Sequence, residues 1–273
     1  MAYPYRYVTP FIYPLFPRKS GRLIIDYNLG NIIAYRAAPG FCGTVTLTFS
    51  AFSEGELLSK EDVPVEVRDG KPELEHVVRH FASEHIGYVE VAPTADRPAF
   101  DKIALVQGFA LFESQGRGTI TFGNDQKFAR APIVQQIAKF GAFCMQHTGV
   151  WVDRERNSGN SFLLINPYAQ ALVATLFSSE RKSLKRRVKK QSATLVSLAD
   201  LLTDQKFGTV MLTANNRVTV FDVRHAYDDP LKIYNLDHTD YMNGWSTHQK
   251  RSAVGALRYY ARCAGREIGV YFS

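Results

Sequence analysis

Residues 64–91 read PVEVRDGKPELEHVVRHFASEHIGYVEV, and residues 185–212 read KRRVKKQSATLVSLADLLTDQKFGTVML. When the two stretches are aligned on Gly87 and Gly208, apolar residues meet apolar residues at a constant offset without a gap. Self-similarity of this kind is the sequence signature of a duplicated folding unit. The matched pairs are Val67 with Val188, Leu74 with Leu195, Val77 with Leu198, Val78 with Ala199, Phe81 with Leu202 and Val89 with Val210.

Short strand patterns fill each copy. Between the second and third expected strands, apolar residues at i, i+3, i+4 and i+7 predict one short helical turn, at 74–81 and at 195–202. Many short strands with little helix are typical of antiparallel sandwiches. We therefore predict a mainly β chain of two tandem antiparallel immunoglobulin-like β-sandwich domains with short helices. The expected strands are 44–49, 63–67 and 87–91 in the first copy, and 171–177, 184–188 and 208–212 in the second.

The repeat and the composition of its flanks divide the chain into five parts. Between the copies, residues 118–122 resemble a strand and residues around 132–145 an apolar helix. In the tail, 253–262 predict a short amphipathic helix and 268–272 an edge strand. The parts are an extended aromatic and proline-rich arm (1–20), the first sandwich (21–125), a bridge with a short helix (126–157), the second sandwich (158–235) and a C-terminal extension (236–273).

The second copy also carries Ser161-Phe-Leu-Leu-Ile-Asn-Pro167, followed by Gly208-Thr-Val-Met-Leu212. This pattern resembles a group of tandem bacterial β-sandwich repeats, and its architecture is similar to that of the small cytoplasmic transducer proteins associated with sensory rhodopsins. The first copy departs from the pattern, because Asn31-Ile-Ile-Ala-Tyr35 replaces the Asn-Pro signature. The resemblance implies a sandwich with an adhesive or adaptor use, and it brings no catalytic residues.

The positive charge of the chain is concentrated in one stretch. The formal net charge is +7, and residues 181–190, RKSLKRRVKK, hold seven positive charges and no negative one. The repeat alignment makes this stretch a hairpin and the start of a strand, with the charges on one exposed face. The face is either solvated, which favours solubility, or bound to an anionic partner such as nucleic acid or lipid headgroups. The candidate anion-binding residues are Arg181, Lys182, Lys185, Arg186, Arg187, Lys189 and Lys190.

A second candidate contact is the N-terminal segment MAYPYRYVTPFIYPLFPRKS. Its prolines argue against a helix and against a central strand, so we expect an extended arm. The arm either packs on its own domain or docks on a partner or sister subunit, since aromatic residues are enriched in interface cores. The candidate partner-binding residues are Tyr3, Tyr5, Tyr7, Phe11, Tyr13 and Phe16.

Residue types suited to catalysis are present without the spacing that catalysis needs. His76 and His80 have the i, i+4 spacing that places two imidazoles on one helix face for a metal ion. The second copy has Ser197 and Leu201 at the matching positions, and the HExxH order is absent. No GxSxG elbow marks a hydrolase. We expect no enzyme, no metal and no cofactor; a metal-dependent hydrolase is the remaining catalytic alternative.

The cysteines and the distribution of apolar residues bear on where the protein works and what it binds. Cys42, Cys144 and Cys263 form no CxxC pair, so neither a disulfide framework nor a zinc ribbon is predicted. No stretch approaches the roughly 18 apolar residues of a membrane span. We expect a cytoplasmic adaptor, either free or peripheral at the inner face of a membrane. It would dock on protein subunits of a larger assembly, or on anionic lipid, through the arm and the basic hairpin. The alternative is a binder of nucleic-acid phosphates, and a homo-oligomer is compatible with both.

Overall fold

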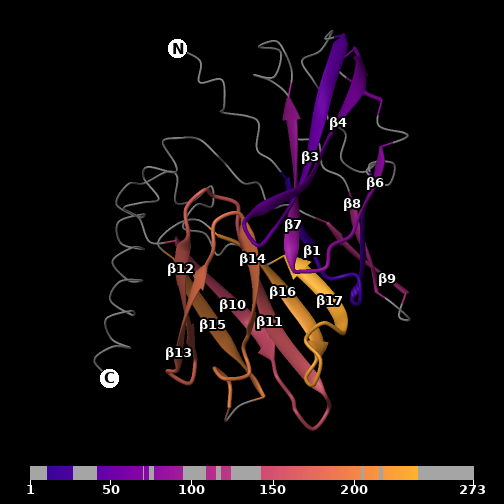
Figure 1. Cartoon of the computed structure of the whole chain (residues 1–273). Coiled ribbons are helices and arrows are strands. Elements are labelled where there is room, and N and C mark those ends of the chain that lie inside the picture. The colour runs from indigo at the N-terminus through magenta and orange to yellow at the C-terminus, as the bar shows by residue number, and fades with distance from the viewer. Residues whose placement is uncertain are drawn as a thin grey trace. The chain divides into compact units, whose positions relative to one another are not determined.

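The computed structural model describes residues 11–26, 42–69, 71–73, 77–94, 109–114, 118–123, 143–203, 206–214 and 218–238. The chain divides into two compact units, unit 1 (Met1–Val134) and unit 2 (Gln135–Ser273) (Figure 1). Every regular element in the described ranges is a strand, and the paired strands run antiparallel. The prediction of a mainly β chain is confirmed. None of these residues forms a helix long and apolar enough to cross a bilayer.

Unit 1 contains two antiparallel sheets. The first has the strand order β1-β7-β3-β4-β5 and the second has the order β6-β2-β8-β9. The strands of the first sheet are β1 (Phe11–Leu15), β7 (Gly87–Thr94), β3 (Gly43–Ser53), β4 (Glu56–Arg68) and β5 (Lys71–Pro72). Those of the second are β6 (Val78–Phe81), β2 (Gly21–Asp26), β8 (Phe109–Ser114) and β9 (Gly118–Gly123).

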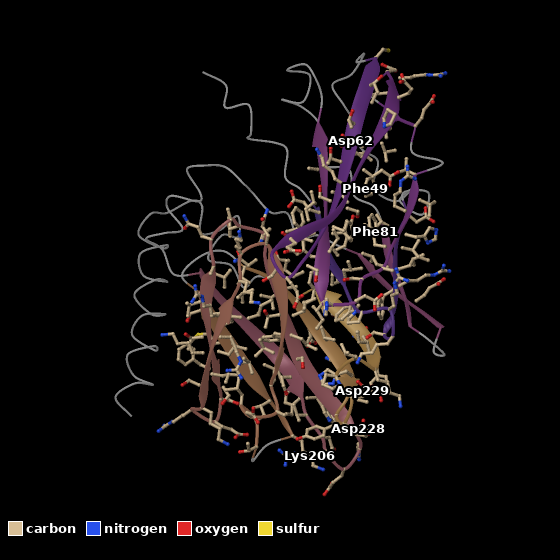
Figure 2. The ribbon with its side chains drawn as sticks, viewed as in Figure 1. Phe49, Asp62, Phe81, Lys206, Asp228 and Asp229 are labelled. Carbon is tan, nitrogen blue, oxygen red and sulfur yellow. The ribbon has the colours of Figure 1, made fainter. Side chains whose placement is uncertain are left out.

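Aromatic rings connect the two sheets of unit 1. Phe49 of β3 stacks on Phe81 of β6, with their ring centroids 6.1 Å apart (Figure 2). Phe16, which follows β1, meets Phe112 of β8 edge-on at 5.4 Å. All four side chains are buried. Because each ring pair joins segments of different sheets, the two sheets contribute to one apolar interior.

Unit 2 also contains two antiparallel sheets, in the orders β10-β15-β12-β13 and β14-β11-β16-β17. The strands of the first are β10 (Phe143–Trp151), β15 (Phe207–Ala214), β12 (Leu172–Ser178) and β13 (Ser183–Val188). Those of the second are β14 (Ser192–Ser197), β11 (Ser158–Asn166), β16 (Thr219–Ala226) and β17 (Ile233–His238). One buried cluster draws on both sheets; it includes Val150, Leu176, Val188 and Leu212 of the first and Phe162, Leu164, Val196 and Val220 of the second.

The two units repeat one strand order. We leave out the two-residue strand β5 and count the remaining strands of each unit from one to eight in chain order. In both units, strands one, six, three and four then form one sheet, in that order. The fifth, second, seventh and eighth strands form the other. The order differs from that of an immunoglobulin domain, in which the first two strands are neighbours in one sheet. Here β1 and β2 belong to different sheets, as do β10 and β11, so the immunoglobulin-like part of the prediction needs correction.

The repeat alignment holds best at its glycine anchor. Gly87 of β7 lies opposite Leu15 of β1, and Gly208 of β15 lies opposite Val150 of β10. Both opposing side chains are fully buried. A Cβ at Gly87 would meet the backbone oxygen of Phe52, and a Cβ at Gly208 would meet the side chains of Leu202 and Ser179. The two glycines therefore occupy corresponding places in the two units.

The predicted short helices are wrong within the described ranges. Val78–Phe81 is strand β6 and Ser192–Ser197 is strand β14, which pair with β2 and β11 respectively. Only one turn follows β14, where Leu202 N–H donates to Leu198 O at 3.3 Å. Apolar spacing over so few residues fits a strand and a turn as well as a helix, and cross-strand hydrogen bonds decide between them.

The predicted arm and bridge also contain strands. Residues 11–15 are β1 and residues 143–151 are β10, the first strand of each unit, so the arm (1–20) and the bridge (126–157) are not separate from the sheets. The end of the helix expected around 132–145 therefore falls in a strand. The helix and strand expected at 253–262 and 268–272 lie outside the described residues.

Candidate protein-binding edge strand

The basic stretch forms strand β13 at the edge of a sheet. β13 pairs with β12 along its whole length, from Leu172 opposite Val188 to Phe177 opposite Ser183. It ends the strand order, and no other strand in the described part of unit 2 pairs with its outer side. An edge strand offers backbone N–H and C=O groups to a further strand. β13 is thus a strand to which another chain can be added.

A tight turn holds β13 against β12. Ser178 N–H donates to Lys182 O at 2.9 Å, and Arg181 adopts a positive φ of 62° between them. Glu180 is mostly buried and accepts a hydrogen bond from Lys182 Nζ at 2.9 Å and another from Thr203 N–H at 3.1 Å. The charge of Lys182 is therefore neutralised inside the turn, and the lysine contributes to the hairpin rather than to an outer face.

The other basic side chains are exposed. Leu184 packs against the core and Val188 is buried in it, while Lys185 and Arg187 point to the opposite face. Arg186 lies on the same side of β13 as Leu184 and Val188, but it is exposed at the edge and donates a hydrogen bond to Lys185 O at 3.1 Å. The charges thus stand on both faces, not one. Among the described carboxylates, none forms an ion pair with Arg181, Lys185, Arg186, Arg187, Lys189 or Lys190.

The corresponding strand of unit 1 is acidic. β4 holds the fourth place in unit 1 that β13 holds in unit 2, and it reads ELLSKEDVPVEVR. β5 pairs only with its end, at Val67 and Arg68, and Glu73 N–H donates to Glu66 O at 2.7 Å. From residue 56 to residue 65, no described strand covers the outer side of β4. The fold therefore leaves two corresponding edges of different charge.

The carboxylates of β4 are held outward by hydroxyl groups. Thr48 Oγ1 donates to Asp62 at 2.6 Å, and Thr44 Oγ1 donates to Glu66 at 2.8 Å. Both carboxylates are exposed, and neither forms an ion pair with a described cation. Hydroxyl donors orient a carboxylate without cancelling its charge. The acidic groups on this face of β4 therefore remain available to a cation.

The aromatic arm contributes to the core of unit 1. Tyr13 lies in β1, opposite Val89 of β7, and is fully buried; Phe16 is buried against Phe112. These two side chains match the reading in which the arm packs on its own domain. Tyr3, Tyr5 and Tyr7, together with the side chain of Phe11, lie outside the described residues.

The histidine pair does not lie on a described helix. His80 is exposed in strand β6, opposite Ile24 of β2, and His76 lies outside the described residues. Among the residues that the structure describes, no three His, Cys, Asp or Glu side chains are grouped to hold a metal ion. The helix-face geometry that suggested a metal site is absent at His80.

A buried serine–histidine pair was missed by sequence reasoning. Ser161 Oγ lies 2.7 Å from His225 Nε2, and His225 Nδ1 lies 2.7 Å from Ala226 O. The carbonyl accepts the Nδ1 proton, so Nε2 accepts the serine hydroxyl. Burial lowers the pKa of His225 and so favours the neutral ring. The Ala226 carbonyl and the Asp229 and Asp222 carboxylates act in the opposite direction but do not outweigh burial. Both side chains are buried, and the pair is a core hydrogen bond rather than an accessible catalytic site.

A second polar cluster fixes the loop between β10 and β11. Asp153 is buried and accepts backbone N–H groups of Glu155 at 3.1 Å and Arg156 at 3.2 Å. Lys206 reaches Asp153 at 3.2 Å and Glu155 at 2.6 Å. Burial alone would raise the pKa of Asp153, but Lys206 and the two N–H groups hold it below its ordinary value. Figure 2 shows Lys206 at the same end of unit 2 as Asp228. These side chains bind one another and the loop backbone, so their role is to hold the loop.

Comparison with known proteins adds no relative. A scan against models of protein families finds no match, and a search of curated proteins finds no significantly similar sequence. The resemblance to tandem bacterial sandwich repeats therefore stays a prediction. Each of the two edge strands, which hold corresponding positions in the two units, is a candidate binding surface of its own unit.

Proposed function

We propose that this chain is a non-enzymatic structural subunit built from two β-sandwich units, and that it joins a larger protein assembly through β13. Each unit has two sheets that contribute to one apolar interior, which favours a sandwich. Many of the apolar side chains of the described strands are buried in these interiors. The serine–histidine pair of Ser161 and His225 is buried.

The observation that carries the proposal is the exposed basic edge. Like charges placed together on one short strand repel one another, and an acidic partner relieves this repulsion. An extended acidic segment added to β13 would gain backbone hydrogen bonds from the edge and ion pairs from the side chains. Recognition by strand addition needs no pocket, only an open edge of suitable charge.

A direct binding experiment tests this function. The probe is a fluorescent peptide of alternating glutamate and valine, which favours an extended strand with one acidic face. We expect it to bind the wild-type chain, and we expect K185E/R187E to weaken binding at least about tenfold. The control K19E/K232E makes the same change in net charge at two exposed lysines outside β13, and it should bind like the wild type.

The second candidate function is binding to nucleic-acid phosphates. The same exposed cations support it, because phosphate binding needs clustered Lys and Arg and no pocket. An oligothymidine of similar length and vesicles containing phosphatidylserine are measured alongside the peptide. Tighter binding of the oligonucleotide, falling steeply as salt rises, would favour this function. Unchanged peptide binding by K185E/R187E would refute the role of β13.

A further inference from the structure

The two units present corresponding edges of opposite charge. β13 carries Lys185, Arg186 and Arg187 with no acidic residue. β4 carries more carboxylates than cations, and residues 56–62 are all exposed. Since the strands occupy the same place in the same strand order, this difference is not a requirement of the fold. It points to a role for each edge.

We propose that β13 of one copy docks on β4 of a second copy of this chain. This inference rests on the proposed function, because it names the acidic partner of β13. No described strand pairs with the outer side of β13 or with the outer side of β4 from residue 56 to residue 65, which makes both edges candidates for an incoming strand. Complementary charge, matched spacing and the repulsion between like edges favour this docking.

The spacing of the charges matches. Asp62 and Glu66 lie four residues apart on the outer face of β4, and Lys185 and Lys189 are also four residues apart. A strand rises about 3.3 Å per residue, so each pair spans about 13 Å. If the two strands run parallel, Lys185 comes opposite Asp62 and Lys189 opposite Glu66, and residues 183–188 lie along residues 60–65, which no described strand covers. The antiparallel arrangement would bring the start of β13 against β5. Lys189 follows β13 directly, so this register requires the incoming strand to extend one residue past Val188.

The middle of this register brings Arg187 opposite Pro64. Proline lacks an N–H group and is tolerated at an open strand edge, where no donor is required. Pro64 therefore removes one backbone hydrogen bond from the contact, and the ion pairs on either side carry more of the affinity. Two leucines near the start of β4, Leu57 and Leu58, are about half exposed at 52% and 49% and add apolar area at the same edge.

The charges also exclude the symmetric alternatives. Two β13 strands side by side would bring Lys and Arg together, and two β4 strands would bring carboxylates together. Only the mixed pair is attractive. The contact joins different surfaces of the two copies. It closes as a twofold dimer if β13 of each copy meets β4 of the other, and it otherwise continues into a ring or a filament.

Sedimentation velocity of the full chain tests the inference. At low salt the wild type should form dimers or larger species as concentration rises, and added NaCl should reverse this. K185E/R187E alone and D62K/E66K alone should each weaken self-association at least about tenfold. An equimolar mixture of the two variants should associate again, because each variant now offers the charge that the other lacks. The control K19E/K232E should behave like the wild type.

The outcomes separate this inference from the proposed function. A wild type that stays monomeric at low salt while β13 binds the acidic peptide would overturn docking between copies and leave the adaptor role intact. Association that neither charge reversal weakens would overturn the assignment of β4 and β13. Restored association in the mixture supports it, and this result also shows that both variants are folded.

Discussion

Replacing Gly159 by alanine should destabilise unit 2 through the ring of His225. Gly159 of β11 lies directly opposite His225 of β16. A Cβ at position 159 would contact Cε1 of the ring and lie 2.7 Å from Nδ1, closer than Cβ atoms approach other atoms in proteins. The backbone itself is not strained, because Gly159 has no positive φ. The alanine can therefore be accommodated only if the ring moves.

The cost follows from the two hydrogen bonds that hold the ring. Both are 2.7 Å long, to Ser161 Oγ and to Ala226 O. A buried polar group left without its partner costs about 1–3 kcal/mol. Displacing the ring breaks both bonds, so we expect a loss of about 2–4 kcal/mol in the free energy of unfolding of unit 2. In a unit of this size, that loss lowers Tm by about 6–12 °C.

Urea unfolding followed by tryptophan fluorescence measures this loss. Both tryptophans, Trp151 and Trp245, belong to unit 2, so the signal reports on that unit. Gly159→Ala is compared in the wild type and in a His225→Ala background. Without the ring, the substitution should cost less than about 1 kcal/mol, from the remaining contact with Tyr227 Cα at 3.2 Å. An equal cost in both backgrounds would refute the role of the ring.

Three further predictions concern titration and the independence of the units. Burial lowers the pKa of His225 in the folded protein, so the unfolded chain takes up a proton first as the pH falls below about 6.5. The free energy of unfolding of unit 2, measured with urea, should therefore fall by at most about 1.4 kcal/mol per pH unit, and His225→Gln should abolish this fall. Lys206→Met should raise the pKa of Asp153, because burial would then act without its cation; an NMR titration of the carboxyl carbon measures this. Phe49→Ala should cost unit 1 about 3–5 kcal/mol by calorimetry and leave the tryptophan transition of unit 2 unchanged; a shift of that transition would show that the units unfold together.

Local sequence pattern located several of the strands. The alternation around Leu184 and Val188 predicted a strand with one buried side, and β13 has it. The glycines at 87 and 208 predicted matching strand starts, which β7 and β15 confirm. Charge density alone located the basic stretch. These features depend on residues close together in the chain, which is why they could be read without coordinates.

Tertiary structure decided which strands are neighbours, and this changed the interpretation of several residues. Leu195 fits a helical spacing, but pairing with Leu163 of β11 makes it part of a strand. Tyr13 was a candidate for partner binding until β1 joined β7 and enclosed it. In both cases a distant strand supplies hydrogen bonds and buried area that the local pattern does not contain.

The candidate site shows the same division. The sequence identified the cations of β13, but the acidic counterpart emerged only when β4 was found at the equivalent edge of unit 1. The pairing of Ser161 with His225 was also invisible, because those residues are 64 positions apart and meet only across adjacent strands. Charge and strand propensity are properties of a segment, whereas an edge, a neighbour and a buried partner exist only after distant segments have paired, since their hydrogen bonds and desolvation depend on both.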